Sequence, residues 1–289
     1  MSSAYDMLVI DLDGTLMGPG GSVSPANVQA VRSAREAGLE IVIATGRALV
    51  ESWKPLQAID HDGIVITAGG SMMCHASDGR TLHRHAMMPE LVGEITAALL
   101  KGGHKVLLLK DPQVAGYDYL AVGEAELDPA SRWWFESLPV RVRFAEHLQE
   151  DPHPQDTVRV GAVADHGELA PLAETLAEQI GDRGFLQHWG AVTETHATGS
   201  PTHLLEVFNP DVSKWTMVAA YCADRGLENG RVAAIGDGLN DVELVREAAL
   251  GIAMGNADRR VIEVADRMTS DCAEDGVAEA IGNLLSGRW

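Results

Sequence analysis

The stretch Met7-Leu8-Val9-Ile10-Asp11-Leu12-Asp13-Gly14-Thr15 decides the fold of this chain. Its first four residues form a solid apolar run, which is typical of a strand buried on both faces of a parallel sheet. Two carboxylates separated by one residue follow at the exit of that strand, beside a glycine turn. One of them can attack phosphorus while the other protonates the leaving oxygen and then activates water. The same short pattern also occurs in turns and calcium loops, so by itself it leaves that alternative open.

The next residues continue an alternation of strands and helices. After the first strand the sequence predicts, in order, a helix starting at Ser24-Pro25, a buried strand at Leu39–Ala44, a helix around Ala48–Ile59 and a strand at Gly63–Thr67. This order predicts a doubly wound α/β layer, in which ligands bind outside the carboxyl ends of the strands.

The alternation is interrupted in the middle of the chain and then returns. Strands and helices are mixed between about residues 82 and 200, which predicts a separate α+β unit. A helix at Ser213–Arg225 and a strand from Arg231 to Ile235 restore the first pattern. We therefore expect a doubly wound parallel-sheet (Rossmann-like) core formed by residues 1–81 and 201–289, with an inserted α+β domain at residues 82–200.

Composition excludes several classes of function. The 289 residues include 42 acidic and 22 basic ones, a formal net charge of -20, and no basic run that could line a groove for nucleic acid. A phosphate site in such an acidic protein must build its own local positive field. The three cysteines, Cys74, Cys222 and Cys272, are scattered and form no CxxC pair, which argues against a disulfide framework or a zinc site.

Targeting signals are also lacking in the sequence pattern. No run approaches the roughly 18 apolar residues of a membrane span, and no basic segment followed by an apolar stretch opens the chain. We expect a cytoplasmic protein without a membrane partner, either a monomer or a homodimer.

Polar residues of the kinds that phosphoryl transfer requires stand at several strand ends. Because parallel strands bring their carboxyl ends to one edge of the sheet, residues more than 200 positions apart can converge there. Carboxylates suit Mg²⁺, and a lysine and a hydroxyl can bind the remaining phosphoryl oxygens. The residues concerned are Asp11, Asp13, Thr45, Lys214, Asp237, Asn240 and Asp241.

With these residues the chain resembles the haloacid dehalogenase-like superfamily of phosphohydrolases, specifically its Cof-type (subclass IIB) branch. The branch pattern is DxDGT, TGR, SK and GDxxND. It occurs here in order at Asp11–Thr15, Thr45–Arg47, Ser213-Lys214 and Gly236–Asp241. The stretches 251–257 and 274–278 are also similar to this branch. The resemblance covers roughly residues 5–75 and 200–289, and it implies that the insertion is a cap domain that supplies specificity.

The resemblance also implies catalytic roles. Asp11 is the nucleophile that forms an aspartyl-phosphate, and Asp13 is the general acid/base. Lys214 offsets the charge of Asp11 and binds phosphate. Magnesium is held by Asp11, by the backbone carbonyl of Asp13 and by Asp237.

Other motif residues are implied to contact the substrate or to support the metal site. The residues implied to bind phosphate or substrate are Thr45, Gly46, Arg47, Lys214 and Asn240. Asp241 is implied to support the metal-bound waters and Lys214 without binding the metal itself. For Arg47, a substrate contact and a loop-anchoring role are both open. The branch often shows Asn-Gly-Ala after the strand that follows TGR, whereas this chain has Gly69-Gly70-Ser71, which puts any contact of that asparagine in doubt.

Histidines and tryptophans of the insertion permit weaker hypotheses. His83 and His85 share a strand face, but without a third ligand a surface pair is favoured over a metal site. His196 is a weaker candidate for a substrate contact. Trp133-Trp134 is expected to pack in the core of the inserted domain.

The function that fits these observations is a magnesium-dependent phosphatase acting on a small phosphorylated metabolite, with a sugar or polyol phosphate as the expected substrate. A phosphomutase on the same core is the first alternative, and inorganic phosphate release separates the two. A non-catalytic sugar-phosphate sensor is a weaker alternative, because every catalytic position is filled.

Overall fold

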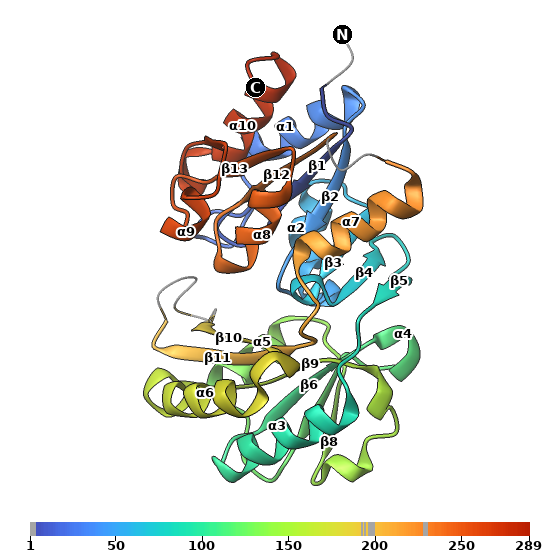
Figure 1. Cartoon of the computed structure of the whole chain (residues 1–289), viewed down its shortest axis with the longest axis vertical. Helices are drawn as coiled ribbons and strands as arrows, with labels where there is room; N and C mark the ends of the chain where they lie inside the picture. Colours follow the sequence, from blue (N-terminus) through green and yellow to red (C-terminus); the bar gives the residue numbers. More distant parts are fainter. Residues whose placement is uncertain (1–3, 192, 194, 196–199, 228–230) are drawn as a thin grey trace. The chain divides into compact units, whose positions relative to one another are not determined.

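The structure is a computed structural model, and it describes residues 4–191, 193, 195, 200–227 and 231–289 (Figure 1). The chain divides into two compact units. The core unit comprises Met1–Leu82 and Ser213–Trp289, and the inserted unit comprises His83–Val212. Each unit has its own sheet and its own hydrophobic core.

The core unit is built on a sheet in which the first and last parts of the chain lie side by side (Figure 1). Its strand order is β14-β13-β12-β1-β2-β3-β4-β5. All pairs from β14 to β3 are parallel, and β4 is antiparallel to β3. The strands are β1 (Met7–Ile10), β2 (Glu40–Ala44), β3 (Ile64–Thr67), β4 (Met72–His75), β5 (Thr81–Arg84), β12 (Val232–Gly236), β13 (Leu250–Ala253) and β14 (Arg267–Met268).

Helices cover both faces of this sheet. The helices are α1 (Pro25–Glu36), α2 (Trp53–Ala58), α7 (Lys214–Arg225), α8 (Val242–Glu247), α9 (Arg259–Ile262) and α10 (Gly276–Leu285). Successive side chains of a strand point to opposite faces. In β1, Leu8 and Ile10 pack with α1 and α10, whereas Met7 and Val9 pack with α7 and α8. All four side chains are fully buried, as the continuous apolar run predicts.

The inserted unit has a six-stranded sheet of order β10-β11-β9-β6-β7-β8, in which β7 and β8 pair in parallel and the other pairs are antiparallel. Helices α3 and α6 share one core with alternate residues of its central strands, such as Val160 of β9 and Leu205 of β11. The strands are β6 (Val106–Lys110), β7 (Tyr119–Val122), β8 (Val142–Ala145), β9 (Thr157–Asp165), β10 (Phe185–Gly190) and β11 (Thr202–Phe208), and the helices are α3 (Pro89–Lys101), α4 (Pro112–Ala115), α5 (Pro129–Ser137) and α6 (His166–Ile180).

The predicted fold class, a doubly wound parallel-sheet core with an inserted α+β unit, is confirmed. The sequence places residues 82–200 in the insertion, whereas the structural unit is His83–Val212. The inserted unit ends later than predicted because β11 pairs on both sides with strands of that unit, β9 and β10. Trp133 and Trp134 are expected in the core of that unit, but they are half-buried, and their rings lie tilted against each other, with centroids 5.7 Å apart and an interplanar angle of 56°.

No helix within the described ranges combines the length and the apolar character that crossing a membrane requires.

Candidate active site

The loop after β1 fixes the position of Asp11. The Asp11 N–H donates to the carbonyl of Ile235 on the neighbouring strand β12, at 3.1 Å. The chain then turns at Gly14, which has φ +77°, and a Cβ on Gly14 would lie 2.3 Å from Oδ2 of Asp237. Glycine is therefore required at this turn, both for the left-handed backbone and for the close approach of Asp237.

Lys214 joins Asp11 to the carboxylates that follow β12. It is the first residue of α7, whose N-cap Ser213 accepts a hydrogen bond from the Thr216 N–H at 3.1 Å. The Lys214 side chain is fully buried, and its Nζ donates to Oδ1 of Asp11 at 2.6 Å and to Oδ1 of Asp241 at 2.7 Å. Residues 203 positions apart thus meet in one ion pair.

The loop after β3 packs against the backbone at the start of α7. Gly70 has φ +109°, and a Cβ there would lie 2.1 Å from the carbonyl oxygen of Ser213. Its neighbour Gly69 has φ +67°. The Gly69-Gly70 pair, which departs from the Asn-Gly of the branch pattern at its first position, therefore lets the backbone pack closely against the residue that precedes Lys214.

Two residues to which sequence reasoning gave no role hold Asp237. The Thr15 hydroxyl donates to Oδ1 of Asp237 at 2.7 Å. Nδ2 of Asn256 donates to the carbonyl of Gly14 at 2.8 Å and to Oδ2 of Asp237 at 3.4 Å. Both residues lie inside quoted motif stretches and follow strand ends, which is the signal that could have identified them.

Both carboxylate oxygens of Asp241 accept hydrogen bonds. Its Oδ2 accepts from the backbone N–H groups of Asp237 at 3.2 Å and Gly238 at 3.0 Å, while Oδ1 accepts from Lys214. The side chain is fully buried. Asp241 therefore positions Lys214 and the turn that carries Asp237.

Negative charge exceeds positive charge at this edge of the sheet. Carboxylate oxygens of Asp11, Asp237 and Asp241 lie within 4.8 Å of one another, and Lys214 is the cation bound between two of them. Burial and the neighbouring carboxylates raise the pKa of Asp11 well above its usual value, despite Lys214. Burial, and then the charge of Asp241, raise the pKa of Asp237 to about 7.

These residues fit a magnesium ion. Mg²⁺ prefers oxygen ligands and is commonly held by one or two carboxylates together with substrate phosphate oxygens. A divalent cation would offset the excess negative charge, which adds to burial in raising both pKa values. Asp11 and Asp237 are the residues that would hold it. Asp241 is fully buried and both of its oxygens accept from Lys214 or backbone N–H groups at 2.7–3.2 Å, whereas Asp237 is half-buried and its Oδ2 accepts only the long 3.4 Å contact from Asn256 among the described residues.

Asp13 and Arg47 form a second ion pair. Arg47 Nε donates to Oδ2 of Asp13 at 2.7 Å, and its Nη2 donates to Oδ1 at 2.5 Å. Nη1 of Arg47 donates to the carbonyl of Glu51, and the Arg47 N–H donates to the hydroxyl of the fully buried Thr45. The Asp13 side chain is 44% exposed. Burial opposes the charge of Arg47, yet Asp13 raises the pKa of the guanidinium above its usual value.

The remaining sequence-predicted residues lie in turns at the same edge. Gly46 lies between Thr45 and Arg47 after β2, and Asn240 is half-buried in the Leu239–Asp241 turn after β12. His196 lies outside the described residues.

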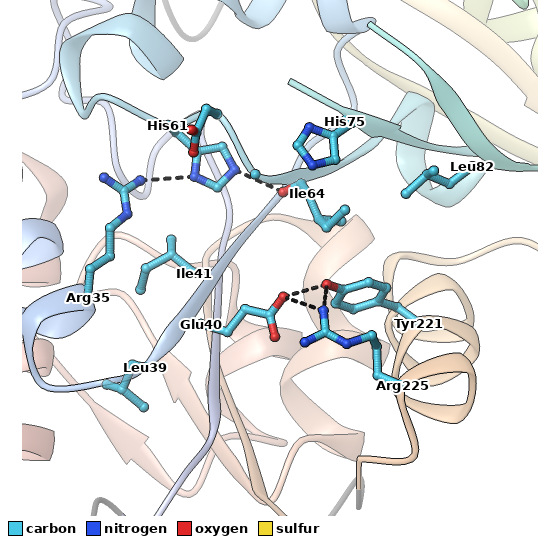
Figure 2. Close-up of a pocket in the computed structure, with 12 residues that line it drawn as sticks. Arg35, Leu39, Glu40, Ile41, His61, Ile64, His75, Leu82, Tyr221 and Arg225 are labelled. Atoms are coloured by element: carbon cyan, nitrogen blue, oxygen red, sulfur yellow. Dashed lines mark hydrogen bonds and ion pairs between the residues drawn. The ribbon is translucent and has the colours of Figure 1, made fainter. Parts of the chain in front are cut away.

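A separate cavity of about 460 Å³ lies near the amino ends of β2 and β3, where Glu40 and Ile64 line it (Figure 2). Nδ1 of His61 accepts from Nη2 of Arg35 at 2.9 Å, and Tyr221 donates to Glu40. Burial lowers the pKa of His61 to about 4. Because the carboxylates follow the carboxyl ends of the strands, this cavity is not part of the candidate active site.

The chain is similar to known proteins in sequence and in fold. A family model described as haloacid dehalogenase-like hydrolase matches residues 8–281. The chain is 26% identical to the 5-amino-6-(5-phospho-D-ribitylamino)uracil phosphatase YcsE of Bacillus subtilis, over 95% of this chain and 94% of that protein. It is also 26% identical to the pyridoxal phosphate phosphatase YbhA of Escherichia coli, over 96% and 98% of the two chains. A solved haloacid dehalogenase-like hydrolase from Bacteroides thetaiotaomicron has the same fold, with a TM-score of 0.78, 23% identity, and coverage of 97% of this chain and 99% of that one.

Proposed function

The chain belongs to the haloacid dehalogenase-like hydrolase family, and from this premise we propose that it is a magnesium-dependent phosphatase of a small phosphorylated metabolite that works through an aspartyl-phosphate. The broad activity, phosphoric monoester hydrolysis, is that of the named relatives. The observation that carries the mechanism is the buried ion pair of Lys214 with Asp11 beside Asp237 and Asp241.

In the first step Asp11 is the nucleophile. Lys214 binds Oδ1, so we assign the attack on phosphorus to Oδ2. The new bond joins Oδ2 to phosphorus, and the bond from phosphorus to the ester oxygen breaks. Asp13 donates its proton to that leaving oxygen. Because Arg47 binds both oxygens of the Asp13 carboxylate, we expect this ion pair to separate before the proton is donated.

In the second step the Asp13 carboxylate accepts a proton from water. The water oxygen attacks phosphorus, the bond from phosphorus to Oδ2 of Asp11 breaks, and inorganic phosphate leaves. Lys214 and the hydroxyl of Thr45 are proposed to bind phosphoryl oxygens.

A magnesium ion held by Asp11, the Asp13 carbonyl and Asp237 would supply positive charge beside the phosphoryl oxygens. Asn240 is proposed to contact substrate or metal-bound water. Gly46 and Arg47 complete the proposed phosphate-binding turn.

The substrate class is supported by the relatives. Their names specify a phosphorylated ribitylaminouracil and pyridoxal phosphate, both small metabolites, and the first carries its phosphate on a polyol chain. We propose a sugar or polyol phosphate as the substrate of this chain.

Phosphate release from a panel of phosphorylated metabolites, measured with Mg²⁺ and with excess EDTA, tests the proposal. Wild type should release phosphate only with Mg²⁺. Asp11→Asn should lower kcat by at least about 10³-fold because an amide cannot act as the nucleophile. The far-ultraviolet circular dichroism of the variant should match that of wild type.

Three results would contradict the proposal. Activity retained by Asp11→Asn would remove Asp11 as the nucleophile, and full activity in EDTA would remove the metal. Transfer of phosphate back to the substrate without release would identify a phosphomutase instead.

A further inference from the structure

We propose that His166, His188 and His203 of the inserted unit form a second cation site, which takes a divalent first-row transition metal ion such as Zn²⁺. One ring nitrogen of each histidine lies within 4.8 Å of the other two. The three residues are 22 and 15 positions apart in the sequence and belong to no short motif, so the fold alone brings them together.

Strand pairing places two of these histidines on one face of the sheet. His203 of β11 lies opposite Ala164 of β9 and Gly190 of β10. His188 is two residues before Gly190 on β10, and it therefore lies diagonally next to His203 on the same face. Ala164 and Gly190 have only a methyl group or a hydrogen, which leaves the space beside His203 to the imidazole rings.

The third histidine comes from the junction of β9 and α6. His166 is the first residue of α6, and its N–H donates to the carbonyl of Pro201 at 3.0 Å, just before β11. Its ring stacks parallel to the ring of His188, with centroids 5.3 Å apart and an interplanar angle of 3°. All three side chains are thus carried by regular elements, which is how a defined metal site is held.

Two of the three nitrogen spacings match tetrahedral coordination. Nδ1 of His203 lies 3.3 Å from Nδ1 of His166 and 3.2 Å from Nε2 of His188. In a tetrahedral zinc site with Zn–N bonds of about 2.0–2.1 Å, ligand nitrogens are about 3.3–3.4 Å apart. An ion at the centre of these nitrogens would have a fourth position, and His166 is exposed, so an ion can reach the site from solvent.

Hydrogen bonds among the rings cannot satisfy all three nitrogens. A neutral imidazole nitrogen either donates one proton or accepts with one lone pair. Nδ1 of His203 faces two nitrogens, so it can bond to only one of them at a time. Burial and the neighbouring rings lower the pKa of both His188 and His203, which favours the neutral, metal-binding form of imidazole.

The ligand type separates this site from the carboxylate site of the core unit. Imidazole suits Zn²⁺, Ni²⁺, Cu²⁺ and Co²⁺, whereas Mg²⁺ prefers oxygen ligands. An ion bound here would connect β10, β11 and the start of α6, and it would stabilise the inserted unit by mass action.

Co²⁺ and Zn²⁺ are the probes that test the site. With Mg²⁺ in large excess to occupy the carboxylates, Co²⁺ should give the visible absorption of a four- or five-coordinate ion at one equivalent, and Zn²⁺ should displace it. His188→Ala and His203→Ala should each weaken Zn²⁺ binding, measured by calorimetry, by at least about 100-fold, because even outer-shell losses cost about 10–100-fold. The matched control His147→Ala changes an exposed histidine of the same unit and should bind as wild type does.

The outcome does not depend on the phosphatase proposal, because the readout is spectroscopic and calorimetric. Phosphate release with Mg²⁺ should be the same in His188→Ala and wild type. The exposed His166→Ala provides a variant that should fold even if His203→Ala does not. The proposal is overturned if wild type gives no Co²⁺ spectrum in excess Mg²⁺, or if His166→Ala and His188→Ala keep the wild-type spectrum.

Discussion

Lys214 is a buried cation between two carboxylates, and its contribution to stability can be measured separately from catalysis. Lys214→Met keeps most of the volume but leaves Asp11 and Asp241 without their shared cation. Removing one partner of a buried ion pair costs about 3–5 kcal/mol, because the remaining charge is uncompensated. We expect a loss of that size in the free energy of unfolding, measured by urea denaturation at pH 7 without metal.

Lys54→Met is the control for this substitution, because Lys54 is exposed. It should change the free energy of unfolding by less than about 0.5 kcal/mol. Equal stability of the two variants would show that the Lys214 pair contributes little to folding.

The raised pKa of Asp237 predicts that the stability of the metal-free protein depends on pH. Its pKa is about 7 in the folded state, against about 3.9 in an unfolded chain. Between those pH values the folded state binds more protons, so the free energy of unfolding falls as the pH rises from about 4 to about 7. Asp237→Asn removes this loss, and in EDTA the variant should exceed wild type by at least about 1 kcal/mol at pH 8 and by less at pH 5.

Urea unfolding at the two pH values checks this expectation. Asp182→Asn changes an exposed aspartate and should show no such pH-dependent gain. A difference between Asp237→Asn and wild type that stays constant from pH 5 to pH 8 would contradict the raised pKa.

At the scale of elements, the start of α7 depends on the loop after β3. In Gly70→Ala the new Cβ would lie 2.1 Å from the Ser213 carbonyl oxygen, on a backbone with φ +109°. The start of α7 must move, and Lys214 moves with it. We expect a loss of stability of at least about 1–3 kcal/mol and a lower kcat for phosphate release.

Gly282→Ala is the matched glycine control. Gly282 lies in α10 with nothing within 4 Å of the added Cβ. Alanine there should stabilise the protein by about 0.5–1 kcal/mol, measured by thermal unfolding, and leave kcat unchanged. If Gly70→Ala behaves like Gly282→Ala, the close packing against Ser213 is not required.

Some elements were predictable and others were not, for a physical reason. The helix predicted at Ser213–Arg225 is α7 (Lys214–Arg225) with Ser213 as its N-cap, because a capping residue and an apolar stripe at helical spacing are local signals. The short strand Tyr119–Val122 is not predicted, because a short apolar run in the mixed middle of the chain cannot be distinguished from a buried helix segment. The sheet to which Thr202–Phe208 belongs depends on its partners β9 and β10, which no local pattern specifies.

At the scale of the whole molecule, a net charge of -20 repels an anionic substrate. Added salt screens this repulsion, because the Debye length falls to about 10 Å at 0.1 M. With Mg²⁺ kept saturating, kcat/KM for a phosphate monoester should therefore rise up to a few-fold as NaCl increases from about 0.01 M to 0.15 M. Stopped-flow or steady-state phosphate release measures it. A steady fall in kcat/KM would indicate that local positive charge dominates the approach of substrate.

The sequence by itself determined the fold class and the residues at the edge of the core sheet. Apolar runs that end in Asp11 and Asp237 place both carboxylates after parallel strands, and parallel strands end at one edge whatever the intervening loops do. Only the tertiary structure decided which donors hold them, such as Thr15 on Asp237. It also decided that His166, His188 and His203 meet, because strand register and helix packing, not spacing along the chain, set their distances.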